Sequence, residues 1–145
     1  YIMSNIEIDD LLVALDDESN HSILNLTSEK INNMKQTVLK EIGLPSEQIE
    51  SLMTTLKYYM YVDEIPDLRV GAFIRWIPLK DPSKIYLTNG GILVNVEIFE
   101  TGVQIRVKNN QNRFFNIKID EVLIFQKLSM QEKIIIKVLD LIDKS

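Results

Sequence analysis

The chain contains no cysteine among its 145 residues. A disulfide framework, a thiolate nucleophile and a cysteine-based zinc site are therefore all excluded. A domain of this length can bury a sufficient apolar core without such cross-links. The lack of cysteine also suits a reducing compartment, because disulfides persist mainly in oxidising ones.

Long apolar runs are also missing. No stretch approaches the ~18 consecutive apolar residues that a membrane-spanning helix needs. Residues 1–5 lack a basic region followed by an apolar run, so we expect no secretory signal. Together these features predict a soluble, intracellular protein of the cytoplasm with no membrane partner.

Patterns typical of catalysis or metal binding are sparse. The single histidine, His21, lies in a polar linker, where an imidazole is usually solvated. The acidic pairs at 63–64 and 120–121 direct adjacent carboxylates apart, which is poor geometry for a shared metal or an acid–base pair. We therefore predict no metal, no cofactor and no enzymatic activity. An enzyme whose site is assembled from scattered residues is kept as a third hypothesis.

The composition, 46% hydrophobic and 26% charged, is that of an ordinary globular protein, but the net charge of −5 is unevenly placed. Residues 1–65 hold 12 acidic and 4 basic side chains, whereas residues 66–128 hold 6 acidic and 9 basic ones. Such asymmetry can mark a basic binding face. We favour the simpler interpretation that the two parts attract each other within the monomer.

The first 65 residues read as helical. Apolar residues recur at helical spacing over 28–42 and 46–61, and a weaker pattern covers 9–18. Gly43 and Pro45 separate the two longer segments, and Pro66 follows the second. Because the link between them is short, these two helices are expected to form an antiparallel hairpin.

From residue 66 to residue 128 the period changes to two, and aromatic and β-branched residues become frequent. This pattern predicts an antiparallel β unit with strands near 72–79, 84–87, 92–99, 103–108, 113–119 and 122–125. The motif Thr-Asn-Gly-Gly at 88–91 is a hairpin signal after the second of these strands. No helix is expected between 91 and 119.

Side-chain parity predicts how the central strands pair. If Ile98 and Ile105 both point inward, the loop between them has an even number of residues, and Glu97 lies opposite Arg106. If Ile105 and Phe115 share the buried face, the next loop is odd-numbered. A three-residue loop at 109–111 is the natural choice, since asparagine tolerates the left-handed conformation. That register places Arg106 opposite Phe114, with Ile117 inward.

Residues 129–145 carry the clearest helix signal, an S-x-x-E capping box formed by Ser129 and Glu132. The apolar surface behind it is too wide for a helix covered on one side only. We therefore expect burial against the rest of the chain and against a partner or a second copy. The candidate interface residues are Ile134, Ile135, Val138, Leu139 and Ile142.

These patterns predict one α+β domain over residues 1–145. In it, an N-terminal helical hairpin packs on a small antiparallel β-barrel or curled sheet of SH3-like type, closed by a C-terminal helix. The outward face of the central strands is the candidate binding face. Its residues are Phe99, Arg106, Lys108, Phe114 and Lys118.

Two binding functions follow from these surfaces. The absence of catalytic patterns and the excess apolar helix surface favour a non-catalytic protein-interaction or assembly module, with a protein partner or self-association. The alternative is a nucleic-acid-binding accessory protein, because single-stranded nucleic acid stacks on aromatics flanked by cations. Glu97 would cancel part of that positive charge. The simpler interpretation is that the acidic N-terminal helices cover both phenylalanines.

Overall fold

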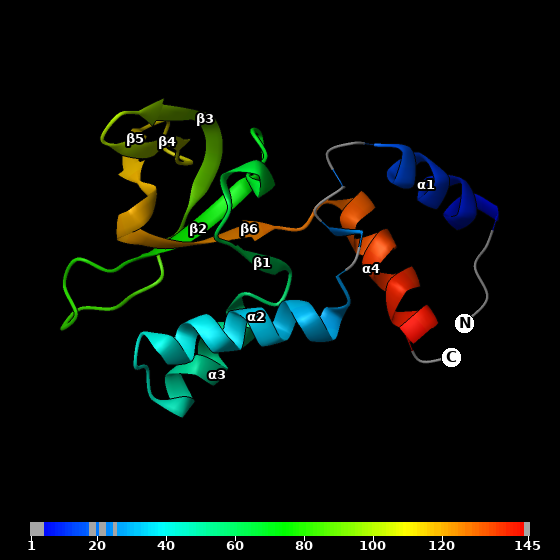
Figure 1. Cartoon of the computed structure of the whole chain (residues 1–145), viewed down its shortest axis with the longest axis horizontal. Coiled ribbons are helices and arrows are strands. Elements are labelled where there is room, and N and C mark those ends of the chain that lie inside the picture. Colours follow the sequence, from blue (N-terminus) through cyan, green and yellow to red (C-terminus); the bar gives the residue numbers. More distant parts are fainter. Residues whose placement is uncertain (1–4, 18–19, 21–22, 25, 144–145) are drawn as a thin grey trace. The chain divides into compact units, whose positions relative to one another are not determined.

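The computed structural model describes residues 5–17, 20, 23–24 and 26–143 (Figure 1). This part of the chain contains four α-helices and one six-stranded antiparallel sheet, so the fold is α+β, as predicted. The chain divides into two compact units. One holds residues 54–127 and the other holds residues 1–53 and 128–145. The prediction of a single domain stays a prediction.

The first unit along the chain is helical. It contains α1 (Asn5–Asp16), α2 (Ser28–Glu41) and most of α3 (Ser46–Thr55). The Thr27 hydroxyl accepts a hydrogen bond from the backbone N–H of Lys30 at 3.3 Å, which caps α2. Gly43, at a φ of +79°, follows the end of this helix. The predicted helix over 28–42 is therefore confirmed within one residue.

The helix predicted over 46–61 is shorter in the structure. α3 ends at Thr55, and β1 (Tyr59–Val62) replaces its expected last turn. The segment Tyr-Met-Tyr-Val is rich in residues that favour strands, and Met60 and Val62 are buried while Tyr59 and Tyr61 are half-buried. The alternating burial of this segment and its pairing with β6 favour a strand over a continuation of the helix.

The six strands are antiparallel, in the spatial order β1-β6-β2-β3-β4-β5. β2 (Phe73–Pro78) pairs with β6 on one side and with β3 on the other. Two short 3₁₀ turns accompany the strands. The remaining elements are β3 (Gly91–Phe99), β4 (Gly102–Lys108), β5 (Phe114–Lys118), β6 (Val122–Lys127), η2 (Ile65–Asp67) and η3 (Ile119–Glu121).

The sheet is open, so the closed barrel, one of the two predicted forms, is not supported. β1 and β5 form its two edges, and no ladder joins them in the described part of the chain. The sheet nevertheless curls. β5 and β6 are four positions apart, which is about 19 Å in a flat sheet. The three residues of η3 that connect them rise only about 6 Å.

The expected strand at 84–87 is also absent. Residues 79–90 form one long loop between β2 and β3, without strand pairing. The glycine at the end of the hairpin signal, Gly91, is instead the first residue of β3. The backbone N–H of Thr88 donates to the carbonyl oxygen of Trp76 at 3.0 Å, so this loop folds back along β2.

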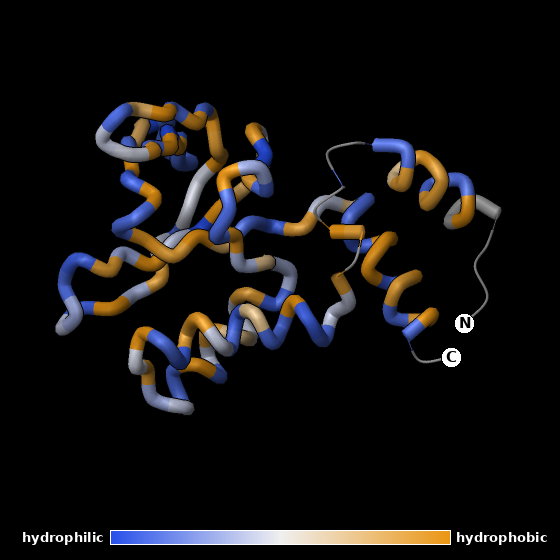
Figure 2. The backbone as a smooth tube through the Cα atoms, in the orientation of Figure 1, coloured by the Kyte–Doolittle hydropathy of each residue, from blue (hydrophilic) through white to orange (hydrophobic). Residues whose placement is uncertain are grey.

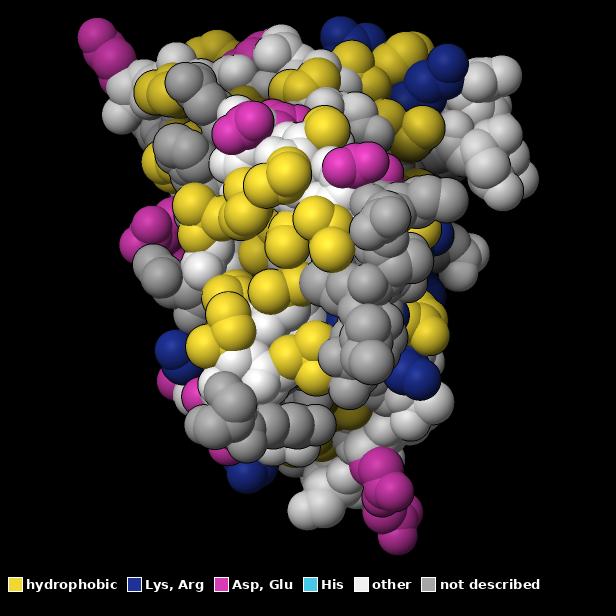
Figure 3. Space-filling model, turned by 90° about the vertical axis from the view of Figure 1, so that its right-hand side faces the viewer, with side chains coloured by type: hydrophobic (Ala, Val, Ile, Leu, Met, Phe, Trp, Pro, Cys, Tyr) yellow, Lys and Arg dark blue, Asp and Glu magenta, His cyan; other side chains and the backbone are white. Residues whose placement is uncertain are grey.

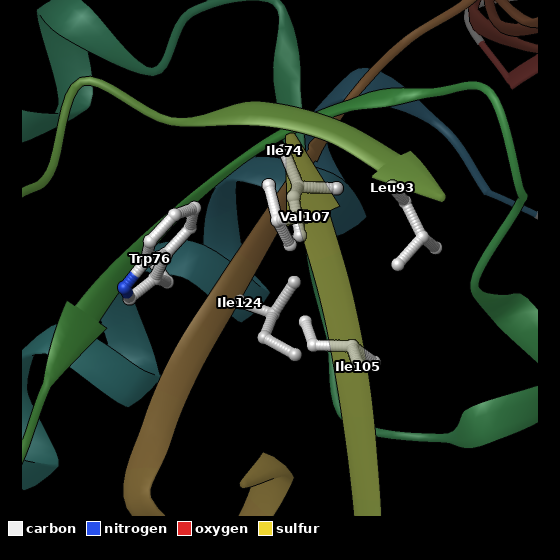
Figure 4. Close-up of a cluster of buried hydrophobic side chains, with 6 residues drawn as sticks. All are labelled: Ile74, Trp76, Leu93, Ile105, Val107 and Ile124. Atoms are coloured by element: carbon white, nitrogen blue, oxygen red, sulfur yellow. The ribbon is translucent and has the colours of Figure 1, made fainter. Parts of the chain in front are cut away.

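A cluster of six buried side chains from four strands forms the core of the β unit (Figure 4). β2, β3, β4 and β6 all contribute, which is the result of the curl. Ile117 packs against this cluster, and Ile105 is buried as predicted. Each fully buried aliphatic side chain stabilises the fold by about 1.5–3 kcal/mol. The cluster consists of Ile74, Trp76, Leu93, Ile105, Val107 and Ile124.

Ile98 does not point into this core. Its side chain is 75% exposed, and the expectation that it lies inside is wrong. The β3–β4 hairpin extends beyond the buried cluster, so Ile98 reaches solvent near its turn. A register shift between Leu93 and Asn95 also breaks the alternation that the sequence suggested. Consequently Leu93 is fully buried and Ile92 is 48% exposed.

Both hairpins keep the predicted parity but not the predicted partners. The β3–β4 turn has two residues, so Glu97 pairs with Gln104 rather than with Arg106. The β4–β5 loop spans residues 109–113, so Phe114 pairs with Lys108 rather than with Arg106. Each register is displaced by two residues. Tight turns decided both cases: Gly102 has a φ of +137° and Asn112 a φ of +61°.

The C-terminal helix α4 (Met130–Asp143) begins at the predicted capping box. The Ser129 N–H donates to Glu132 Oε1 at 2.8 Å, and the Glu132 N–H donates to Ser129 Oγ at 3.1 Å. Hydrophobic residues line most of its length (Figure 2). No helix in the described part of the chain is both long and apolar enough to cross a bilayer.

Polar contacts tie the helices of this unit together. The Asp140 carboxylate of α4 accepts from the backbone N–H of Ser28 at 2.8 Å and from its hydroxyl at 2.6 Å. A carboxylate suits this position because the N-terminus of α2 carries partial positive charge. The Asn20 amide donates to the Ala14 carbonyl at 2.8 Å and to Gln131 Oε1 at 3.0 Å, which connects α1 with α4.

Lys35 of α2 is fully buried, and burial lowers the pKa of its ammonium group from 10.5 to about 8. In the unfolded chain the Lys35 ammonium group is solvated, so its pKa returns to 10.5. Between about pH 8 and 10.5 the unfolded state therefore binds more protons than the folded state, and the stability contributed by Lys35 rises with pH. Below about pH 8 Lys35 is charged in both states, so the folded state bears the full cost of burying this charge.

We therefore expect the free energy of unfolding to depend on pH differently in a Lys35→Met variant. Any advantage of the variant, up to about 3 kcal/mol near neutral pH, should shrink as the pH rises through the window. Urea denaturation of both proteins at several pH values measures the difference. The exposed Lys40→Met on the same helix is the control. A difference that stays constant with pH would contradict the assignment.

Candidate functional site

An open groove of about 420 Å³ crosses one end of the β unit. Its walls come from β2, the long loop before β3, the β4–β5 loop and β5. Aromatic rings, a threonine hydroxyl and four side-chain amides line it. The lining residues are Trp76, Tyr86, Thr88, Asn89, Gly90, Asn109, Asn110, Gln111 and Phe115.

Three aromatic rings supply the apolar part of the groove. Trp76 is 8% exposed and belongs to the core cluster, but its indole nitrogen points away from the other five side chains of that cluster (Figure 4). The ring centroids of Trp76 and Phe115 lie 6.4 Å apart at 59°, a tilted pair. Phe115 and Tyr86 are both partly exposed. The core therefore holds one ring rigidly and leaves the other two accessible to a ligand.

The loop over 79–90 is held against β2 by hydrogen bonds at Thr88. Besides the bond from its own N–H, its hydroxyl accepts from the backbone N–H of Trp76 at 3.2 Å, and its carbonyl accepts from Arg75 Nε at 2.8 Å. Gly90 has a φ of +86°, and a Cβ there would lie 2.2 Å from the Ile74 carbonyl oxygen. Only glycine fits this close approach of the loop to β2.

The opposite wall is shaped by Asn109. Its side-chain oxygen accepts from the backbone N–H groups of Gln111 and Arg113, each at 3.0 Å. Its own N–H donates to the Arg113 carbonyl at 2.9 Å, which closes the loop. Asn110 and Gln111 are thereby held at the rim with exposed side chains. Their amides can both donate and accept hydrogen bonds.

The side chains that line the groove carry no charge, and the Lys84 ammonium group lies 5.9 Å from the centre of the Tyr86 ring. None of its nine lining residues is an acid, a lysine, an arginine, a histidine or a cysteine. In addition, no group of three metal-ligating side chains forms among the described residues. Such a lining can stack against a flat or apolar ligand and hydrogen-bond to it, but it offers no acid–base pair and no activated nucleophile. His21 lies outside the described residues.

The predicted binding face lies on the outer side of β3, β4 and β5, and the structure gathers only part of it. The Arg106 guanidinium lies 4.4 Å from the centre of the Phe114 ring, and Lys108 is the direct partner of Phe114. Lys118 pairs with Gln104, which lies four residues before Lys108 on β4. Phe99 pairs with Gly102 at the far end of the hairpin. It is thus about 20 Å along the strand from the Phe114 row.

The expectation that Phe99 and Phe114 share one cluster is therefore wrong. The two-residue β3–β4 turn and the five-residue β4–β5 loop place them at opposite ends of the face. Phe99 is 46% and Phe114 is 50% exposed. What remains as a possible site is the group of Arg106, Lys108 and Phe114.

The predicted interface residues of α4 divide by burial. Ile135 is buried, Ile134, Val138 and Leu139 are half-buried, and Ile142 is 63% exposed. Of these five residues, Ile142 near the C-terminal end of the helix is the most exposed. Burial of these residues against a partner stays a prediction.

Sequence reasoning missed the groove. Parity placed Phe115 inward, which is the correct side, but nothing in the periodicity showed that the core ends beside it. The groove forms because a loop without periodicity folds back onto β2 through Thr88. The only signals were the single tryptophan in a strand and the Asn-rich loop that follows β4.

An Asn109→Ala variant should destabilise the β unit. The change removes the acceptor of two backbone hydrogen bonds, which costs about 1–2 kcal/mol. Urea denaturation measures the loss. Asn110→Ala is the matched control, since this exposed neighbour should change stability by less than about 0.5 kcal/mol. Equal losses in the two variants would contradict the assigned role of Asn109.

Comparisons with known proteins give no relative for this chain. No protein-family model, no curated protein and no solved structure matches it. No residue therefore inherits a role from another protein, and the site rests on its own geometry and chemistry.

Proposed function

We propose that the chain is a non-catalytic protein-interaction module whose β unit binds an extended, proline-containing peptide segment in the groove. The observation that carries the proposal is the lining: three aromatic rings beside neutral amides, with no charged side chain. Aromatic grooves of this kind bind polyproline II segments, which are already extended and lose little entropy on docking.

The hydrogen-bonding groups of the groove fit this type of ligand. A polyproline II segment has no internal hydrogen bonds, so its carbonyl oxygens remain available as acceptors. The indole N–H of Trp76 and the amide N–H₂ groups of Asn89, Asn110 and Gln111 are donors along the groove. Proline lacks an N–H, so it leaves no donor unsatisfied when its ring stacks on Phe115 or Tyr86.

An SH3-like architecture for the β unit belongs to the same proposal. It is supported by the meander β3-β4-β5 with short turns, by the single 3₁₀ turn that leads to β6, and by the pairing of β6 with β2. The long loop between β2 and β3 forms one wall of the groove. Binding at the loop end of a curled sheet leaves the fold itself undisturbed.

The single tryptophan allows a direct test. Titration with a short, uncharged, proline-rich synthetic peptide should change the fluorescence of Trp76, because the indole lies in the groove. Phe115→Ala should weaken binding by about tenfold or more, as loss of a central aromatic contact does. Phe114→Ala is the matched control, since its ring points to the opposite face of β5. Equal weakening in both variants, or no fluorescence change in the parent protein, would overturn the proposal.

A second candidate function is the binding of single-stranded nucleic acid on the outer face. It is favoured by the stacked Arg106–Phe114 pair with Lys108 beside it. The nearby Glu97 opposes it, because this carboxylate lies on the same face. The overall charge of −5 also disfavours binding to phosphate.

The same two phenylalanines distinguish this candidate. Binding to a labelled single-stranded DNA oligonucleotide should fall in Phe114→Ala and Arg106→Gln, and should weaken steeply as salt is raised. Phe115→Ala is now the control. Fluorescence anisotropy at several salt concentrations measures the effect. An oligonucleotide affinity that neither outer-face variant reduces would remove this candidate.

A further inference from the structure

α1 carries an exposed apolar stripe. Ile8, Leu12 and Leu15 follow one another at intervals of four and three residues, so they lie on one side of the helix. They are 43%, 55% and 42% exposed, whereas Ala14 on the other side is completely buried. α1 therefore packs through one side and presents a second apolar side to solvent.

The neighbouring helix also has apolar side chains that are not fully buried. α1 packs on α4, in which Ile142 is exposed and Val138 is half-buried. Hydrophobic side chains gather on the face that these helices present (Figure 3). Contiguous exposed apolar surface is uncommon on monomeric proteins and often marks a binding site.

Acidic side chains border this surface on one side. Asp9 and Asp16 are seven residues apart. Leu12 lies three residues after Asp9 and four residues before Asp16, so both carboxylates are its neighbours on the helix surface. Both carboxylates are exposed. α1 contains four acidic residues and no basic one. The apolar stripe is thus flanked by a row of negative charge.

The negative charge of the helical unit distinguishes between the kinds of molecule that could bind to the α1 stripe. The helical unit holds 13 acidic and 6 basic residues, a formal charge of −7. A second copy on this face would bring two such units together, and an anionic lipid surface would meet the same repulsion. A cationic partner gains attraction instead.

We propose that the face formed by Ile8, Leu12 and Leu15 docks a basic amphipathic helix of a partner protein. The apolar side of that helix lies along the α1 stripe, and its lysine or arginine side chains pair with Asp9 and Asp16. A helix fits because the stripe is straight and has helical spacing, so that a partner helix can interdigitate with it. This binding surface is independent of the groove in the β unit.

The test compares two synthetic amphipathic peptides that share one apolar side. One carries lysines on its polar side and the other carries glutamates. Fluorescence anisotropy with the full chain should show at least tenfold tighter binding of the lysine peptide, with an affinity that falls as salt is raised. Leu12→Ser combined with Leu15→Ser should weaken this binding by tenfold or more. Ile98→Ser, an exposed isoleucine of the β unit, is the control that should change nothing.

A charge-swap variant keeps the test decisive if the serine variant does not fold. Asp9→Lys combined with Asp16→Lys retains the apolar stripe and should reverse the preference, so that the glutamate peptide binds more tightly. Three results would overturn the proposal. They are absence of lysine-peptide binding by the parent chain, equal binding of the two peptides, and a dimer seen by light scattering that the serine variant dissociates. The last result would assign the face to a second copy.

Discussion

The short connection between β5 and β6 is the constraint on which the β unit depends. Three residues of η3 must return the chain from one edge of the sheet to a strand four positions away. A flat sheet cannot meet this condition, so the strands curl and enclose the cluster around Ile105 and Ile124. The same curl sets β2 and β5 close enough for Trp76 and Phe115 to make ring contact. The core and the groove thus have one cause.

Alternation along β5 then separates two kinds of surface. Phe114 and Phe115 are neighbours in the chain, yet one stacks with Arg106 on the outer face and the other lines the neutral groove. In a strand, successive side chains point to opposite faces, so adjacent residues of one type can serve unrelated sites. The two rings therefore have different surroundings. Phe114 lies beside cationic side chains, whereas Phe115 lies beside amides and a tryptophan.

Local signals of the sequence predicted the elements better than their pairing. The α2 cap and the Ser129–Glu132 box were predictable because each requires only residues within one turn. The even and odd lengths of the two hairpin loops were predictable for a similar reason, since one buried face determines them, but the bulge that breaks the alternation in β3 was not. Which residues pair across the strands was not predictable, because a register shift by two residues conserves parity. Only the turn geometry at Gly102 and Asn112 decides between such registers.

The remaining differences required non-local information. β1 exists because β6 offers it a partner, and the isolated segment 59–62 has no turn signal that separates it from α3. The groove depends on Thr88, whose two hydrogen bonds to Trp76 join residues 12 apart without periodicity. For the predicted face, the two-residue β3–β4 turn and the five-residue β4–β5 loop separated Phe99 from the group. Each of these features comes from tertiary pairing rather than from local preference.

Charge is distributed so that the two proposed surfaces respond to different properties of a ligand. The β unit holds 8 acidic and 10 basic side chains, a formal charge of +2, and yet the groove lining is free of charge. A neutral groove selects by shape, stacking and hydrogen-bond position, which salt hardly affects. The α1 face combines apolar area with exposed carboxylates, so attraction depends on ionic strength while apolar contact determines how long a partner stays bound. The two proposed ligands would therefore differ in chemistry, and neither would need the charges that the other uses.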